Sequence, residues 1–374
     1  MGRSPIVIVG GGMAGFAVAR ELKQRGNTRD VLMLTADEGR FYAKPLLSHV
    51  LSRATPAAAL LMSPEKAASA NQVRVVPRTE VIRADFEAKT VHAADGRAFR
   101  YGDLVVATGA RPLDFWHGDR IFSVNSVVDM SRLEPVLEDA KTILIAGAGF
   151  VGLEFANDWA RAGKQVTVVS LDGPLRPLVP QSVSAWVEER LTRAGVRFVR
   201  GRVTPVHEGA KLCAEVDGER LTARFDLMLS AVGLGPDVAL WNQAGLVTGR
   251  HGVVVNARFQ TNIAHVYAVG DVMEFQGQAW RFVTALNHAA KVIASNLRGE
   301  ESCENFGALP ISLKCPDSPL AMVLPRVQGS GSWEAKAGDA DLEATYRQDG
   351  KLWGFVLGGS AANRRRQFED ELAA

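Results

Sequence analysis

The stretch Ile6-Val-Ile-Val-Gly-Gly-Gly-Met-Ala-Gly15 places a short apolar run directly before four glycines. The β-branched run predicts a buried parallel strand, and Phe16–Gln24 predicts a helix. In this G-x-G-x-x-G spacing Gly10 makes the tight turn, Gly12 lets the backbone approach a pyrophosphate, and Gly15 lets the helix close on the strand. The pyrophosphate would then meet free N–H groups and the positive end of the helix dipole.

The same device recurs in the middle of the chain. Thr142–Ile145 predicts the strand, Gly147-Ala-Gly149-Phe-Val-Gly152 the turn, and Leu153–Ala162 the helix. A lone pattern of this kind is weak evidence, because glycine-rich turns are common. Two copies, each set between a strand and a helix and each followed by a second strand (31–34 and 165–169), indicate two dinucleotide-binding folds. The alternative is that both are tight turns without a ligand.

Neither second strand ends in the carboxylate that usually binds the ribose hydroxyls. Thr35 and Ser170 occupy those places, and Asp37 and Asp172 follow two positions later. The usual rule for telling NAD from NADP is therefore lost. Arg176 could belong to a 2′-phosphate site, but an arginine in a solvated loop is the simpler explanation because no charge cluster surrounds it.

Bulk properties limit the remaining choices. A chain of 374 residues holds two or three domains, and 47% hydrophobic with 22% charged residues is typical of a soluble globular protein. A formal net charge of +2 argues against general nucleic-acid binding. The three cysteines have no metal-ligand spacing, so we expect no metal site and a reducing, cytoplasmic location. The apolar stretch Ile6–Ala19 is broken by glycines, so we expect neither a signal peptide nor membrane insertion.

Three further segments carry a resemblance to a known family. Leu104–Pro112 is an apolar strand that ends in Ala-Thr-Gly, Leu227–Pro236 is its weaker echo, and His265–Asp271 places an acid just after a strand. The sequence resembles the two-dinucleotide flavoprotein reductases, whose fold has an NAD domain inserted in an FAD domain. The resemblance implies FAD and NADH as cofactors, with NADPH possible.

The segment Arg40–Ser48 narrows the resemblance. Disulfide reductases of this fold carry redox cysteines near here, but this chain has no cysteine before Cys213, which argues against dithiol chemistry beside the flavin. Lys44-Pro45, the preceding Ala36–Arg40 and the later Gly152–Asp158 are similar to the rubredoxin–NAD reductase and flavorubredoxin reductase branch.

The resemblance implies a role for each matching residue. Lys44 would lie beside the reactive face of the flavin, where its charge would stabilise the negative charge of the reduced ring, and Glu154 would pair with it and face the nicotinamide. An ordinary surface ion pair is the simpler alternative. The other residues implied to bind a cofactor are Gly10, Gly12, Met13, Ala14, Gly15, Thr35, Ala36, Arg40, Pro45, Val81, Ala107, Thr108, Gly109, Gly147, Gly149, Phe150, Val151, Gly152, Ser170, Gly233, Gly270, Asp271, Val283 and Lys314.

Two of these implied contacts have plain structural alternatives. Lys314 could equally be an exposed lysine at the end of a strand. His288, in the helix expected up to Leu297, is more simply a packed or surface residue than a catalytic one.

The order of motifs predicts three domains. Residues 1–111 and 235–305 would form the FAD domain, 112–234 the inserted NAD domain, and 307–374 a small α+β domain. In the last of these, Leu342–Tyr346 and Leu352–Leu357 flank an Asp349-Gly350 turn and predict a hairpin, and Ser360–Leu372 predicts a charged helix.

The function implied by the resemblance is electron transfer from NADH through FAD to a small rubredoxin-type carrier. Arg364-Arg-Arg366 and a pI of about 8.4 would suit weak docking of an acidic partner, although such a run is also an ordinary solvated helix face. Alternatives are a ferredoxin, quinone or small-molecule reductase, or a sensor that binds NADH without turnover. We expect a monomer or homodimer.

Overall fold

The computed structural model describes residues 4–209, 211–326 and 331–373. The chain divides into two compact units. The first contains residues 1–43, 60–111 and 234–306, and the second contains 44–59, 112–233 and 307–374. Two of the changes of unit fall at a pair of short strands: one lies within β8 (Ala110–Pro112) and the other directly precedes β17 (Leu234–Pro236). The three-domain division stays a prediction, because the last segment is counted with the second unit.

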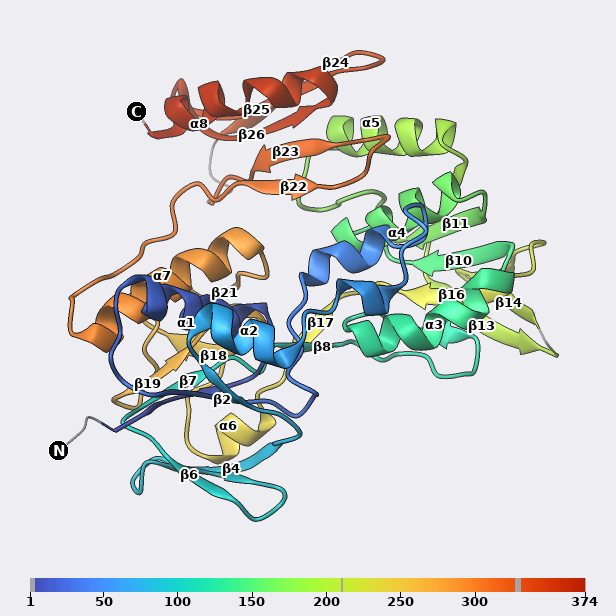
Figure 1. Cartoon of the computed structure of the whole chain (residues 1–374). Helices are drawn as coiled ribbons and strands as arrows, with labels where there is room; N and C mark the ends of the chain where they lie inside the picture. Colours follow the sequence, from blue (N-terminus) through green and yellow to red (C-terminus); the bar gives the residue numbers. More distant parts are fainter. Residues whose placement is uncertain (1–3, 210, 327–330, 374) are drawn as a thin grey trace. The chain divides into compact units, whose positions relative to one another are not determined.

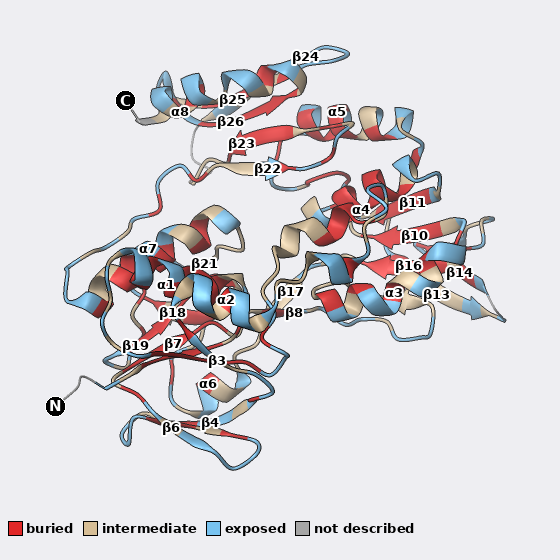
Figure 2. Ribbon diagram, in the orientation of Figure 1, coloured by how far each residue is buried: buried red, intermediate tan, exposed pale blue. Residues whose placement is uncertain are grey.

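The core of the first unit is a five-stranded parallel sheet with the order β19-β7-β1-β2-β3. Every residue of four of these strands is buried, as expected for a sheet covered on both faces (Figure 2). The strands are β1 (Ile6–Val9), β2 (Val31–Leu34), β3 (Arg74–Val76), β7 (Asp103–Val106) and β19 (Val266–Ala268).

Helices α1 (Met13–Gln24) and α7 (Val283–Arg298) pack against one another beside this sheet (Figure 1). Both bury an apolar stripe, for example Phe16 and Leu22 on α1. The rest of the unit is peripheral: α2 (Pro64–Asn71), α6 (Ala239–Gln243), the antiparallel sheet β4 (Val81–Asp85), β5 (Thr90–Ala93) and β6 (Ala98–Arg100), and the small sheet β18 (Val253–Val255), β20 (Met273–Phe275) and β21 (Gln278–Ala279).

The second unit repeats this architecture around the second glycine pattern. Its parallel sheet has the order β12-β11-β10-β16-β9, so in both sheets the strand before the glycines lies in the centre. The strands are β9 (Ile121–Phe122), β10 (Thr142–Ala146), β11 (Gln165–Ser170), β12 (Val196–Arg200) and β16 (Leu227–Ser230). The helices are α3 (Val127–Asp139), α4 (Phe150–Arg161) and α5 (Gln181–Arg193). A side sheet is formed by β13 (Val203–Glu208), β14 (Lys211–Val216) and β15 (Glu219–Arg220).

The C-terminal segment is antiparallel, with the strand order β22-β23-β26-β25-β24. These strands are β22 (Ile311–Leu313), β23 (Leu320–Val323), β24 (Ser332–Ala337), β25 (Leu342–Gln348) and β26 (Lys351–Gly358). The predicted hairpin is confirmed: β25 pairs with β26, and Asp349 and Gly350 have φ of 51° and 77°, as its turn requires. The predicted fold class, two Rossmann-like α/β folds with a small α+β segment at the C-terminus, is confirmed.

The predicted helix over 360–372 is wrong in its first turn. Gly359–Arg364 is a 3₁₀ turn (η4), and the α-helix α8 spans Arg365–Ala373. The carboxylate of Asp341 accepts a hydrogen bond from Ser360 N at 2.6 Å, and Gly359 has φ +62°, so the chain turns sharply before the helix begins. No helix in the described ranges is long and apolar enough to cross a membrane.

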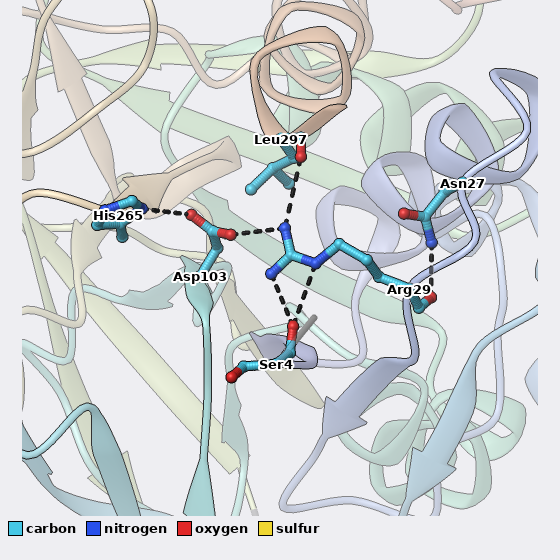
Figure 3. A network of polar contacts seen from close by, with 6 residues as sticks. All are labelled: Ser4, Asn27, Arg29, Asp103, His265 and Leu297. Carbon is cyan, nitrogen blue, oxygen red and sulfur yellow. Dashed lines mark hydrogen bonds and ion pairs between the residues drawn. The ribbon is translucent and has the colours of Figure 1, made fainter. Parts of the chain in front are cut away.

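A buried ion pair joins five segments at the amino end of the first sheet (Figure 3). Arg29 Nη1 lies 2.7 Å from Asp103 Oδ2, and both side chains are nearly buried. The same guanidinium donates to the carbonyls of Ser4 and Leu297, and His265 Nδ1 lies 3.0 Å from the other oxygen of Asp103. The strand starts and the end of α7 are thereby held together by one cation.

We expect Arg29→Met to lower the free energy of unfolding by about 3 kcal/mol, because it leaves the Asp103 carboxylate buried without its cation. Chemical denaturation of the purified protein measures this. Arg298→Met is the control, since its ion pair with Glu300 is exposed and should contribute less than about 1 kcal/mol. Equal losses for the two variants would contradict a special role of Arg29.

Candidate active site

The first glycine turn has the geometry that a pyrophosphate-binding turn needs. Gly10 has φ +119°, and a Cβ there would lie 2.1 Å from the carbonyl oxygen of Ala107. A Cβ on Gly15 would lie 2.2 Å from the carbonyl oxygen of Gly10, so only glycine lets α1 come this close to the turn. At Gly12, by contrast, a Cβ would meet no described atom within 4 Å, which leaves an open face for a ligand.

The second turn repeats this geometry residue for residue. Gly147 has φ +103°, and a Cβ there would lie 2.4 Å from the carbonyl oxygen of Ala231. A Cβ on Gly152 would lie 2.1 Å from the carbonyl oxygen of Gly147. A Cβ on Gly149, like one on Gly12, would meet no described atom within 4 Å. Both turns therefore fit a dinucleotide, and binding itself stays a prediction.

Both glycine helices begin without a side-chain cap. Gly12 and Gly149 are the N-cap residues of α1 and α4, neither N-cap has a side-chain hydrogen bond in the described structure, and neither first turn contains an acid. The free N–H groups and the positive helix end consequently remain available to an anion.

The tertiary structure brings the predicted Gly270-Asp271 pair to the first turn. Gly270 has φ +77°, and a Cβ there would lie 2.7 Å from the Cβ of Ala14 in the first turn of α1. The 3₁₀ turn η3 (Gly270–Val272) thus packs directly beside the candidate FAD pyrophosphate site. This position suits the cofactor contact that the resemblance implies for Asp271.

At the end of β2 the expected ribose residue is already engaged. Thr35 is buried, and its hydroxyl donates to Asp37 Oδ1 at 2.7 Å, which also accepts from Gly39 N at 2.8 Å. Arg40 forms an exposed ion pair with Glu38 at 3.2 Å, while Ala36 is exposed. The structure therefore places Asp37 as the carboxylate at this edge.

Other predicted contact residues lie at strand ends and helix starts. Val151 and Val283 are 50% and 40% exposed in the first turns of α4 and α7, so both side chains are accessible for packing against a planar ring. Thr108 Oγ1 accepts from Trp241 Nε1 at 3.1 Å. The remaining members are placed as follows: Met13 and Phe150 in the first turns of α1 and α4, Val81 at the start of β4, Ala107 and Gly109 after β7, Ser170 at the end of β11, and Gly233 before β17.

The charged residues expected at the flavin gather in the second unit. Lys44 Nζ donates to Asn125 Oδ1 at 2.7 Å, and Pro45 follows it in the 3₁₀ turn η1 (Lys44–His49). Glu154 is only 8% exposed; one oxygen accepts from Ser48 Oγ at 2.8 Å and the other from the backbone N of Lys314 at 3.1 Å. The expected ion pair of Lys44 with Glu154 stays a prediction.

Asp158, one helical turn after Glu154, has a role that was not predicted from the sequence. Asp158 is buried and accepts from Leu51 N at 3.1 Å and from the Ser52 hydroxyl, so it fastens the segment after η1 to α4. Burial raises the pKa of this carboxyl, against the hydrogen bonds from Ser52 that lower it. The i,i+4 spacing of Glu154 and Asp158 on a largely apolar helix was the signal in the sequence that could have identified Asp158.

His49 was also overlooked and is buried beside these acids. Burial lowers its pKa, while the charges of Glu154 and Asp158 raise it and those of Arg53 and Lys314 lower it. The imidazole is therefore held toward its neutral form.

His288 is exposed, and Cys315 is buried. His288 Nδ1 lies 3.0 Å from Glu304 Oε2 in a partly exposed pair, the simpler of the two readings of that residue. Cys315 is buried, and burial together with nearby Glu154 and Asp317 raises the pKa of its thiol, which favours the protonated form. All three cysteines are free.

Comparison with known families assigns the class. Residues 4–291 match the model of the pyridine nucleotide-disulphide oxidoreductases, and residues 305–372 match that of the rubredoxin binding C-terminal domain. The chain belongs to the pyridine nucleotide-disulphide oxidoreductase family. It is an NAD(P)H-dependent flavin oxidoreductase of the rubredoxin reductase type, as the resemblance implied.

Similarity to individual relatives extends over almost the whole chain. It is 37% identical to rubredoxin-NAD(+) reductase of Alcanivorax borkumensis, covering 99% of both chains. It is 32% identical to nitric oxide reductase FlRd-NAD(+) reductase of Aeromonas salmonicida, covering 95% of this chain and 92% of the relative.

Among solved structures, the ferredoxin reductase of Rhodopseudomonas palustris has a TM-score of 0.87 at 26% identity, covering 97% of this chain and 93% of that one. The putidaredoxin reductase in a covalent complex with putidaredoxin has a TM-score of 0.88, covering 100% of this chain and 93% of that one; at 24% identity this likeness concerns the fold.

We expect His49→Gln to flatten the pH dependence of stability. Because folding lowers the pKa of His49 below its ordinary 6.5, the unfolded chain takes up a proton there first, and the free energy of unfolding falls as the pH drops below about 6.5. Denaturation curves between about pH 5 and 8 measure this slope. His117→Gln, which changes an exposed histidine, is the control and should keep the wild-type slope. An unchanged slope in His49→Gln would refute the assignment.

Proposed function

We propose that this enzyme transfers electrons from NADH, through bound FAD, to a small rubredoxin-type iron protein. The observation that carries the proposal is the presence in one chain of two uncapped glycine turns and a C-terminal domain of the rubredoxin-binding type. Similarity to rubredoxin-NAD(+) reductase over 99% of the chain supports it.

FAD, when bound, accepts a hydride from the nicotinamide and returns the electrons one at a time. The chain's own contribution is binding and electrostatics. The N-terminus of α1 and the adjacent Asp271 would hold FAD, and the N-terminus of α4 would hold the nicotinamide dinucleotide. The open faces at Gly12 and Gly149 support this assignment.

Lys44 and Glu154 are the proposed catalytic residues. The Lys44 ammonium would stabilise negative charge that develops on the flavin ring as hydride arrives. Glu154 is held by donors from two different segments, Ser48 and Lys314, which fixes its carboxylate for contact with the nicotinamide.

The proposed electrostatic docking through Arg364–Arg366 is weaker than the sequence alone suggests. Arg364 pairs with Glu343, and Arg365 pairs with Glu369 at 2.5 Å. Arg366 is exposed, so one charge of the run, rather than three, is offered to a partner.

A ferredoxin is the second candidate acceptor, favoured by the 26% identity to the Rhodopseudomonas palustris ferredoxin reductase. Rates of NADH-dependent reduction of a rubredoxin and of a [2Fe–2S] ferredoxin, measured side by side, decide between them. A reduced enzyme that neither carrier reoxidises within one turnover would instead indicate a sensor of NADH.

We expect Lys44→Met to slow flavin reduction by NADH roughly 100-fold while FAD stays bound, because the variant removes a fixed positive charge. Stopped-flow absorbance of the flavin measures the rate, and the FAD content of the purified variant checks binding. Lys351→Met, at the exposed start of β26, is the control and should keep the wild-type rate. A wild-type rate in Lys44→Met would remove the proposed role.

We expect ionic strength to act on only one half of the reaction. Raising it from about 0.01 to about 0.1 M shortens the screening length from about 30 to about 10 Å and should slow rubredoxin reduction about threefold, since few unpaired charges are involved. Reduction by NADH should change little. Equal sensitivity of the two steps would contradict electrostatic docking.

A further inference from the structure

Arg200 lies beside the end of strand β11, where the ribose of the second dinucleotide is expected. Strands β11 and β12 are parallel neighbours with Ser170 opposite Arg200, and Gly201 N donates to Ser170 O at 3.0 Å. Arg200 therefore leaves the carboxyl edge of the sheet next to Ser170. In folds of this type, the loop after the second strand borders the 2′ position of the adenosine ribose.

The usual selector between NADH and NADPH is lacking at this edge. A carboxylate at the strand end favours the ribose diol, and a nearby arginine favours the 2′-phosphate. Here the strand ends in Ser170, whose hydroxyl is buried and has no hydrogen-bond partner among the described residues. The choice must therefore depend on neighbouring charges.

The guanidinium of Arg200 folds back over the loop that follows β11. A Cβ on Gly173 would lie 2.7 Å from Arg200 Nη2 and 2.9 Å from its Cζ, so this loop position has to be glycine for the guanidinium to lie there. The same guanidinium forms an ion pair with Glu188 on α5, and the two side chains are 39% and 30% exposed.

The loop 171–180 itself contributes one cation, Arg176, and one anion, Asp172. Arg176 Nη1 donates to the carbonyl oxygen of Val179, and Asp172 adds an exposed negative charge two residues after Ser170. Arg200, at the end of the neighbouring strand β12, lies beside Ser170 and could reach a 2′-phosphate there, but Glu188 already pairs with it.

We propose that the Glu188–Arg200 ion pair determines the preference for NADH. Glu188 holds and neutralises the guanidinium, so the doubly negative 2′-phosphate of NADPH meets a carboxylate and a paired cation, whereas the uncharged ribose diol of NADH meets no such barrier. Glu188 and Arg200 are specificity-determining residues. This inference rests on the proposed function, because it concerns the electron donor of the same site.

Glu188→Gln tests the proposal, because it removes the competing charge and keeps the length of the side chain. We expect the ratio of kcat/KM for NADPH to that for NADH to rise at least tenfold, with ferricyanide as acceptor. The affinity for 2′,5′-ADP relative to 5′-AMP, measured by titration calorimetry on the FAD-loaded protein, should rise in parallel. Adding Arg200→Gln to this variant should return both ratios to within about twofold of the wild type.

Glu189→Gln is the matched control. It lies on the same helix at the next position, and its carboxylate pairs with Arg193 instead. It should leave both ratios unchanged.

The proposal is overturned if Glu188→Gln leaves both ratios within about twofold of the wild type, or if the wild type already uses both nucleotides equally. Ferricyanide as acceptor and binding of the two adenosine phosphates make the test independent of the protein partner. Failure to reduce rubredoxin would therefore contradict the proposed function without contradicting this inference.

Discussion

In each candidate dinucleotide site, the carbonyl oxygen of the first glycine lies where the third glycine would have a side chain. Both sites depend on this close approach of the helix to the glycine turn. The oxygen of Gly10 lies 2.2 Å from where a Cβ of Gly15 would be, and the oxygen of Gly147 lies 2.1 Å from where that of Gly152 would be. Only with hydrogen at these positions can each helix begin directly at the end of the central strand. The first turn then lies at the point where neighbouring strands lead to opposite sides, which is where ligands bind in such sheets. The unhindered middle glycines and uncapped helix starts follow from the same geometry.

Backbone groups and charged side chains have different electrostatic roles in the candidate sites. The backbone would receive the phosphates, because free N–H groups and helix dipoles supply positive potential without a titratable group. Side chains are used where a charge must sit at one place. Glu154 is held by Ser48 and by the backbone of Lys314, and Asp158 holds the segment that carries Lys44. A buried carboxylate is costly unless such donors surround it, so the placement of these acids fixes η1 on α4.

Charged side chains elsewhere in the protein are also paired. Several arginines that look free in the sequence pair with carboxylates from other elements: Arg364 with Glu343, Arg200 with Glu188, and Arg29 with Asp103. A formal charge counted along the chain therefore overstates what a partner or a phosphate encounters. At a site for an anionic cofactor, pairing of this kind would also oppose binding of the wrong anion.

The sequence by itself determined both glycine turns, the parallel strands around them, the hairpin at Asp349-Gly350 and the family, because these depend on local spacing and on residues that no other type can replace. It missed His49 and Asp158, whose importance comes from burial, and it placed the last helix a turn too early because the contact of Asp341 with Ser360 is not local. Only the tertiary structure decided that Gly270 packs on Ala14, that Glu154 is held by Ser48 and Lys314, and that Glu188 neutralises Arg200. The physical reason is that turns are set by the dihedral angles of neighbouring residues, whereas burial and charge pairing are set by segments far apart in the chain.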